Sequence, residues 1–382
     1  MTSNDPPASP TAEAGHILPA AHFDALLTLL HEDCFDVRGP RVQGGALEIG
    51  KLPNAAALPQ GCSATQEPGA WRLQHTGTPA WFGITHGGMS WKALLHPART
   101  RLWSAERTAD GFSVHEDAGP AKPFAFIGVR ACDLRAIAVQ DNVLQRGPYV
   151  DAVYNARRNG AFLVTVDCAE PSGTCFCVSM GSGPAAGSGY DLALTELDAG
   201  SASHRFLVRT GSRAGEAVVQ RLGLCEATHQ DSASAKAIVE GASARMGRSM
   251  DATAARATLS ANRESPHWQD VAQRCLSCGN CTMVCPTCFC TTVEDTSDLS
   301  GDIAERWRLW DSCFTFGFTH VAGGTVRESA GARYRHWISH KLLNLHEQFD
   351  ESGCVGCGRC ITWCPVGIDI TAEVAALPQD VS

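Results

Sequence analysis

The sequence contains no long apolar run. Nowhere in its 382 residues does a stretch approach the ~18 consecutive apolar residues that a membrane-spanning helix needs. The first sixteen residues, MTSNDPPASPTAEAGH, also lack the basic start and the apolar core of a secretory signal peptide. These absences predict a chain without a membrane span, located in the cytoplasm, whose residues 1–16 are disordered because they offer little apolar surface to bury.

Positive charge is also scarce. The formal net charge is −9, which argues against a nucleic-acid-binding protein, whose footprint would be basic. The 14 histidines show no metal-binding spacing such as His-x3-His next to a carboxylate: His336 and His340 are four apart, but they lie in a basic stretch. Neither a nickel site nor a catalytic zinc site is therefore predicted. The glycine pattern Gly181-x-Gly183-x3-Gly187 is not the dinucleotide fingerprint. We interpret Ser182-Gly183-Pro184 as a structural turn, with a cradle for a flavin or nucleotide phosphate as the alternative, and expect no flavin on this chain.

Cysteine, by contrast, is abundant and unevenly distributed. The chain has 18 cysteines, and 11 of them fall within the 90 residues from Cys275 to Cys364. A secreted disulfide scaffold is usually short and spreads its cysteines along the whole fold. This distribution therefore indicates metal ligands in a reducing compartment.

The strongest motif is a four-cysteine run that occurs twice. Both copies have the spacing Cys-x2-Cys-x2-Cys-x3-Cys-Pro, which is typical of [4Fe–4S] clusters in bacterial ferredoxins. In such two-cluster domains the fourth cysteine of each run ligates the other cluster. The spacing therefore predicts two [4Fe–4S] clusters: cluster A with Cys275, Cys278, Cys281 and Cys364, and cluster B with Cys354, Cys357, Cys360 and Cys285.

Zinc is the alternative for these runs, since Cys-x2-Cys pairs also build zinc ribbons. A zinc site has no use for the third cysteine or for the Cys-Pro ending, however, and both features occur twice here. Gly279, Gly356 and Gly358 fit tight loops that approach a cluster and let backbone N–H groups donate to its sulfur atoms.

The two runs are separated by an insertion of 68 residues, 286–353, which ferredoxins lack. One interpretation is a helical cap whose tryptophans, Trp307 and Trp310, shield the clusters and whose charges are solvated. The other is that its basic residues dock an acidic redox partner or a nucleotide phosphate. The basic set comprises Arg327, Arg333, Arg335 and Lys341. The insertion also contains three thiols expected to be buried near cluster B, with direct ligation as the alternative: Cys288, Cys290 and Cys313.

A second group of cysteines follows two predicted strands. The apolar run 124–129 leads into Cys132 and a helix that Asp133 can N-cap, and the apolar run 161–166 ends at Asp167-Cys168. In open parallel sheets the functional crevice lies at the carboxyl ends of the strands. Asp133 and Asp167 are candidate ligands or supporting groups there. These positions predict a candidate third [4Fe–4S] site, with ordinary buried thiols as the alternative, comprising Cys132, Cys168, Cys175 and Cys177.

These patterns divide the chain into parts. Residues 17–262 are predicted to form an α/β or α+β domain that carries the candidate third site. Residues 263–382 are predicted to form a helical, ferredoxin-like dicluster domain.

Six segments of the chain are similar to segments of a known protein family. Through them the chain resembles the beta subunit of cytoplasmic NAD(P)-linked nickel–iron hydrogenases, or sulfhydrogenases, and the related electron-transfer subunit of anaerobic sulfite reductase. CPTCFC followed by WDSC narrows the match to this family. The segments are GVRACDLRAI (128–137), DCAEPSGTCFCVSMGSGP (167–184), RCLSCGNCTMVCPTCFCTTVEDT (274–296), RWRLWDSC (306–313), ARYRHWISHK (332–341) and CVGCGRCITWCPVGIDI (354–370).

The resemblance implies an electron-transfer subunit within a hetero-oligomer. Its partners would be a flavin-bearing subunit that handles NAD(P)H and a catalytic subunit that handles hydrogen, with the sulfite reductase counterpart as an alternative. The chain by itself would then catalyse no substrate chemistry. A third alternative is a self-contained oxidoreductase that binds its own flavin. The sequence leaves open the choice between NAD and NADP, the reduction potentials and the direction of electron flow.

Overall fold

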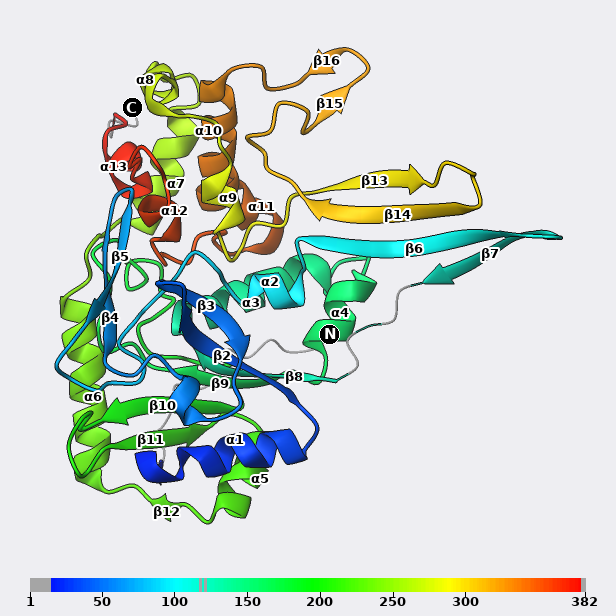
Figure 1. The fold of residues 1–382 in the computed structure, drawn as a ribbon. Helices are drawn as coiled ribbons and strands as arrows, with labels where there is room; N and C mark the ends of the chain where they lie inside the picture. Colours follow the sequence, from blue (N-terminus) through cyan, green and yellow to red (C-terminus); the bar gives the residue numbers. More distant parts are fainter. Residues whose placement is uncertain (1–14, 117–118, 120–121, 379–382) are drawn as a thin grey trace, which may run out of the picture.

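The computed structural model describes residues 15–116, 119 and 122–378 (Figure 1). Of the segment predicted to be disordered, residues 1–14 lie outside these ranges, and strand β1 begins at His16. Within the described residues, no helix is long and apolar enough to cross a membrane.

An eight-stranded mixed sheet forms the centre of the first part of the chain, in the order β12-β1-β11-β10-β9-β8-β2-β3. The strands β2, β8, β9 and β10 are parallel neighbours, and the other pairs are antiparallel. The prediction of a mixed α/β structure is therefore confirmed. The strands are β1 (His16–Pro19), β2 (Asp36–Gln43), β3 (Ala46–Lys51), β8 (Phe124–Val129), β9 (Phe162–Val166), β10 (Leu192–Leu197), β11 (Arg205–Thr210) and β12 (Cys225–Glu226).

Alternate residues of β8 enter two different cores, which explains why this short strand is apolar throughout. Ala125 and Ile127 pack with α1 and α5 on one face of the sheet, whereas Phe124 and Phe126 pack with α2, α3 and α4 on the other. Figure 1 shows α1 and α5 below the sheet and α2 and α3 above it. The helices of this part are α1 (Phe23–Glu32), α2 (Lys92–Leu95), α3 (Ala131–Leu144), α4 (Ala152–Arg158), α5 (Arg213–Leu222) and α6 (His229–Ala244), with 3-10 turns at Ala20–His22 and Ala55–Ala57.

The C-terminal part is built around its own apolar core, to which Trp268, Phe314, Tyr334, Trp337 and Ile361 contribute. Helices surround this core, but the prediction of a helical domain describes only part of the region, because the insertion also contains strands. The helices are α7 (Ala252–Ala261), α8 (His267–Arg274), α9 (Asn280–Met283), α10 (Ala330–Ser339), the π-helix η3 (His340–Asn344), α11 (Leu345–Phe349), α12 (Arg359–Thr362) and α13 (Ile370–Ala375).

Two strands of the insertion, β13 and β14, belong to a four-stranded sheet that extends away from the rest of the molecule (Figure 1). β14 pairs with β6, which lies about two hundred residues earlier in the chain. The helical-cap interpretation missed this hairpin because the partner that stabilises it is remote in sequence, although β-branched and aromatic residues favour strands here. The strands are β6 (Arg99–Thr108), β7 (Gly111–Glu116), β13 (Thr291–Ser297) and β14 (Ile303–Trp310), followed by the short pair β15 (His320–Val321) and β16 (Gly324–Thr325).

A second hairpin, β4 (Cys62–Glu67) and β5 (Ala70–His75), reaches from the first part of the chain to the second cysteine run. The Gly69 N–H donates to the Ile361 carbonyl over 3.2 Å. Trp71 stacks on Trp363, with ring centroids 6.2 Å apart. Together with the β6–β14 pairing, these contacts join segments on both sides of residue 262.

Candidate metal centres

The first cysteine run lies between two helices of the C-terminal part. Cys275 and Cys278 occupy the segment between α8 and α9, and Cys281 lies in α9. Cys364, from the second run, joins them around a cavity whose walls are largely apolar, and Cys360 also lines it. The structure therefore brings together the four residues predicted to hold cluster A.

Cys285 lies with the second run rather than with its own. Its charge acts on the thiols of Cys354, Cys357 and Cys360, which places all four sulfur atoms in one neighbourhood. Burial raises the pKa of Cys354 to about 12. Thiols buried in this way stay protonated unless a metal or a cation stabilises the thiolate. The residues predicted for cluster B are thus also brought together, in surroundings that suit a metal–thiolate centre.

Both cysteine runs turn on a glycine with a left-handed backbone. Gly279 has φ 76° and precedes α9, and Gly358 has φ 75° and precedes α12. A side chain at either position would be strained in this conformation. Backbone N–H groups near these turns point at sulfur atoms: Gly356 N–H donates to Cys354 Sγ over 3.5 Å, and Ile368 N–H donates to Cys364 Sγ over 3.3 Å. Such donors set the reduction potential of a bound cluster.

A buried lysine faces the sulfur atoms of the cluster B set. Lys341 Nζ lies 3.0 Å from Cys285 Sγ and 3.2 Å from Thr287 Oγ1. No carboxylate of the described residues forms an ion pair with it, and its side chain lies in the interior. Burial opposes the charged form, but the sulfur atoms of Cys285 and Cys288 outweigh it and raise the pKa of Lys341 well above its ordinary value. The cation is therefore placed to balance the negative charge of a thiolate-bound cluster.

Replacing Lys341 with methionine is expected to lower the reduction potential of cluster B by roughly 50–150 mV. A unit charge about 4 Å away contributes on the order of 1–4 kcal/mol between dielectric constants of 80 and 20, and 59 mV corresponds to a tenfold change for one electron. Lys341→Arg, which keeps the charge, should retain most of the potential. Spectroscopic titration of the anaerobic protein measures this shift, and an unchanged potential with unchanged iron content would contradict it.

The basic set predicted in the insertion does not form one surface. Lys341 is buried against the cysteines, and Arg333 is also in the interior. Arg335 pairs with Glu264 over 2.8 Å, and Arg327 donates to Thr319. The solvated and the docking interpretations are therefore both wrong for Lys341. Sequence alone could not show this, because the direction in which η3 faces is set by tertiary packing.

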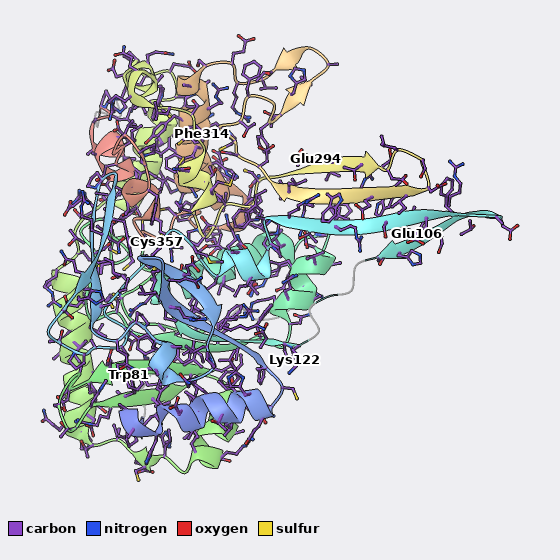
Figure 2. All side chains as sticks on the ribbon, in the orientation of Figure 1. Trp81, Glu106, Lys122, Glu294, Phe314 and Cys357 are labelled. Carbon is purple, nitrogen blue, oxygen red and sulfur yellow. The ribbon has the colours of Figure 1, made fainter. Side chains whose placement is uncertain are left out.

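The four cysteines of the candidate third site line one cavity. Cys132 lies in the first turn of α3, directly after β8, and Cys168 follows β9. Cys175 and Cys177 come from the next loop, and all four side chains are buried. Cys132 and Cys177 also pack against Cys357, which lies between the sheet and the C-terminal helices (Figure 2). The carboxyl ends of β8 and β9 lie side by side, as expected, and this brings the four cysteines together.

The two aspartates beside this cavity form hydrogen bonds with side chains outside it. Asp133 accepts two hydrogen bonds from Arg359, over 2.7 and 2.9 Å, and Asp167 accepts from Arg209 over 2.9 Å and from Thr195 over 2.7 Å. Neither carboxylate lines the cavity, so their positions favour the supporting role over that of ligands. The N-cap prediction is also wrong, because Arg130 is the N-cap residue and Asp133 lies within α3.

The glycine-rich loop predicted as a turn packs against the cysteines. Ser182 is buried and donates to the Val355 carbonyl over 2.6 Å. A Cβ atom on Gly183 would lie 3.0 Å from Cys177 Sγ. These contacts favour the structural interpretation of the turn. The loop also lines, with α3, a cleft of about 650 Å³.

Three further thiols surround Lys341. Cys288, Cys290 and Cys313 line a cavity beside it. Cys313 is buried, as predicted for thiols near cluster B, whereas Cys288 and Cys290 are half-buried. Hydrogen bonding with Cys313 lowers the pKa of Cys290 to about 7. The repeated tetrapeptide TCFC, at 174–177 and 287–290, is a sequence signal that marks both cysteine-lined loops.

Sequence reasoning missed three polar residues of these sites. His86 Nε2 lies 3.5 Å from Cys132 Sγ, Arg130 lines the same cavity, and Lys92 lies near Cys285 and Cys288 with its Nζ 3.9 Å from the Trp310 ring centroid. His86 and Lys92 come from segments without a recognisable motif, and Arg130 lies in the segment 128–137, where only its cysteine and aspartate were singled out.

The donor sets fit iron–sulfur clusters. Each predicted set supplies four cysteine sulfur atoms, and N–H donors or a buried cation stand beside them. Among the residues that the structure describes, no three histidine, cysteine, aspartate or glutamate side chains are arranged to hold a single metal ion.

Comparisons with known proteins agree with the resemblance noted in the sequence. A family model described as a 4Fe-4S dicluster domain matches residues 274–368. Sulfhydrogenase 2 subunit beta of Pyrococcus furiosus is 36% identical over 249 residues, which cover 64% of this chain and 71% of that protein. No solved structure matches the chain. The chain therefore belongs to the family of sulfhydrogenase beta subunits and is an iron–sulfur electron-transfer subunit.

Proposed function

We propose that this subunit relays electrons between a flavin-bearing subunit that handles NAD(P)H and a nickel–iron catalytic subunit. Two [4Fe–4S] clusters, held by the sets assigned to clusters A and B, would each accept and release one electron at a time. The complex is a hetero-oligomer of the cytoplasm, and substrate chemistry belongs to its other subunits.

The observation that carries this proposal is the exchange of the fourth cysteines. Cys364 lies with the first run, and Cys285 lies with the second. Each run thus needs the other to complete its set, so the two centres are held in one core. The chain's own residues do the rest: Gly279 and Gly358 shape the loops, backbone N–H groups donate to sulfur, and Lys341 supplies a buried positive charge.

Capture of the tagged full-length chain from its own cells, under anaerobic conditions, tests both the cofactors and the partners. We expect at least about eight iron and eight sulfide atoms per chain, counting four of each per cluster. Nickel in the captured complex supports the hydrogenase partner, whereas sirohaem absorption would assign the chain to a sulfite reductase. Flavin on the isolated chain would indicate a self-contained oxidoreductase, and zinc without iron would overturn the proposal.

A further inference from the structure

A third set of four cysteines converges on one cavity outside the dicluster motif. Cys132 and Cys168 follow β8 and β9, two parallel strands in direct contact, so their positions meet at the same edge of the sheet. Cys175 and Cys177 enter from the loop that follows Cys168. The four side chains are between 2% and 7% exposed, and none forms a disulfide bond.

The surroundings of this cavity favour an anionic metal–thiolate centre. Both neighbouring aspartates are taken by arginines, so thiols are the metal-binding groups that dominate the lining. Arg130 is buried in the wall, and its guanidinium donates to the backbone oxygens of Ile84, over 2.9 Å, and Asp167, over 3.2 Å. Within the described part of the chain, no carboxylate pairs with Arg130. A buried cation without a carboxylate is costly, and a cluster bound by four thiolates would balance it.

The loop that carries two of these cysteines packs directly against the second cysteine run. Phe176 N–H donates to the Gly356 carbonyl over 2.8 Å, and Cys175 Sγ lies 3.8 Å from the Cys357 carbonyl oxygen. A Cβ atom on Gly356 would lie 2.5 Å from the Phe176 carbonyl oxygen, and one on Gly358 would lie 2.4 Å from that of Thr174. Both glycines are therefore needed for close approach as well as for their turns. The packing places the third cavity beside the cluster B set.

We propose that Cys132, Cys168, Cys175 and Cys177 hold a third [4Fe–4S] cluster that exchanges electrons with cluster B. This proposal rests on the proposed electron-transfer function and extends the relay into the α/β sheet. In each exchange one cluster loses one electron and the other gains it, and no bond or proton changes place. The third cluster, at the edge of the N-terminal sheet, would then be one end of the electron-transfer chain.

The test is an iron and sulfide count on the full-length chain, produced anaerobically, with three variants. We expect about twelve iron atoms in the unmodified chain and about eight in Cys175→Ala, counting four per cluster. Cys62→Ala, which removes a buried cysteine outside the three sets, should keep about twelve. Cys278→Ala, in the cluster A set, should lose about four iron atoms if the dicluster motif holds its clusters as proposed.

The outcomes separate this proposal from the proposed function. Loss of about four iron atoms in Cys278→Ala but none in Cys175→Ala would overturn the third cluster and leave the dicluster relay standing. Zinc at this site in the unmodified chain, with about eight iron atoms instead of twelve, would also overturn it. If Cys175→Ala does not fold, Cys168→Ser gives the same readout with a smaller change in size. Spin-resonance spectra of the reduced chain should lose a cluster–cluster interaction in the variant that lacks the third site.

Discussion

Replacing Cys364 with alanine should remove cluster A, although Cys364 belongs to the second cysteine run. Its side chain lines the cavity formed by Cys275, Cys278 and Cys281, and the Ile368 N–H group donates to its sulfur. Removing one of four thiolates leaves an iron atom without a protein ligand, so we expect about four iron atoms to be lost per chain. Cluster B should remain.

Double replacement makes this prediction sharp. Cys364→Ala combined with Cys278→Ala should still lose only about four iron atoms, because both residues serve one cluster, whereas Cys364→Ala combined with Cys354→Ala should lose about eight. Iron and sulfide analysis of the anaerobic chain measures both values. Cys34→Ala, at an exposed thiol, is the control that should lose none. A loss of about eight in the first double variant would show that each run holds its own cluster.

The groupings of cysteines could be predicted from sequence because they depend on local spacing and on strand ends. The repeated run fixes which thiols share a loop, and the crossing of the fourth cysteine follows from the stereochemistry of such loops. The third set was predictable because two short apolar runs, 124–129 and 161–166, are recognisable as buried strands whose carboxyl ends meet. The mixed α/β structure and the family resemblance, both predicted from the same patterns, are confirmed.

The charged residues of the sites were not predictable in the same way. Lys341 stands in a basic stretch that is typical of a solvated helix face, yet it is buried beside Cys285. Asp133 follows a strand in the position of a helix cap, yet it is withdrawn into an ion pair with Arg359. Both outcomes depend on contacts between segments far apart in sequence, and single-sequence patterns carry no record of such contacts. The β6–β14 pairing escaped prediction for the same reason.

The Arg359–Asp133 pair joins the second cysteine run to α3, and both side chains are almost fully buried, at 3% and 4% exposure. Burial opposes the charge of Arg359, but Asp133 and Cys357 outweigh it and raise the pKa of the guanidinium further above its ordinary value. Arg359 also donates to the Gly87 carbonyl over 3.3 Å. The pair therefore holds the dicluster loop against the helix that carries Cys132.

Replacing Arg359 with methionine should lower the free energy of unfolding by about 3–5 kcal/mol, because removing one partner leaves a buried carboxylate unpaired. The double variant Arg359→Met/Asp133→Leu should recover most of this loss, since it removes both charges together. Lys236→Met provides the matched control: Lys236 and Glu240 form an exposed pair, 77% and 66% accessible, whose removal should cost less than about 1 kcal/mol.

Denaturant unfolding of the cluster-loaded chain under anaerobic conditions, followed by far-ultraviolet circular dichroism, measures these differences as shifts of the midpoint at constant slope. A shift for Arg359→Met no larger than that for Lys236→Met would contradict the prediction. A double variant as unstable as the single one would show that Arg359 stabilises the loop through Cys357 and Gly87 rather than through Asp133.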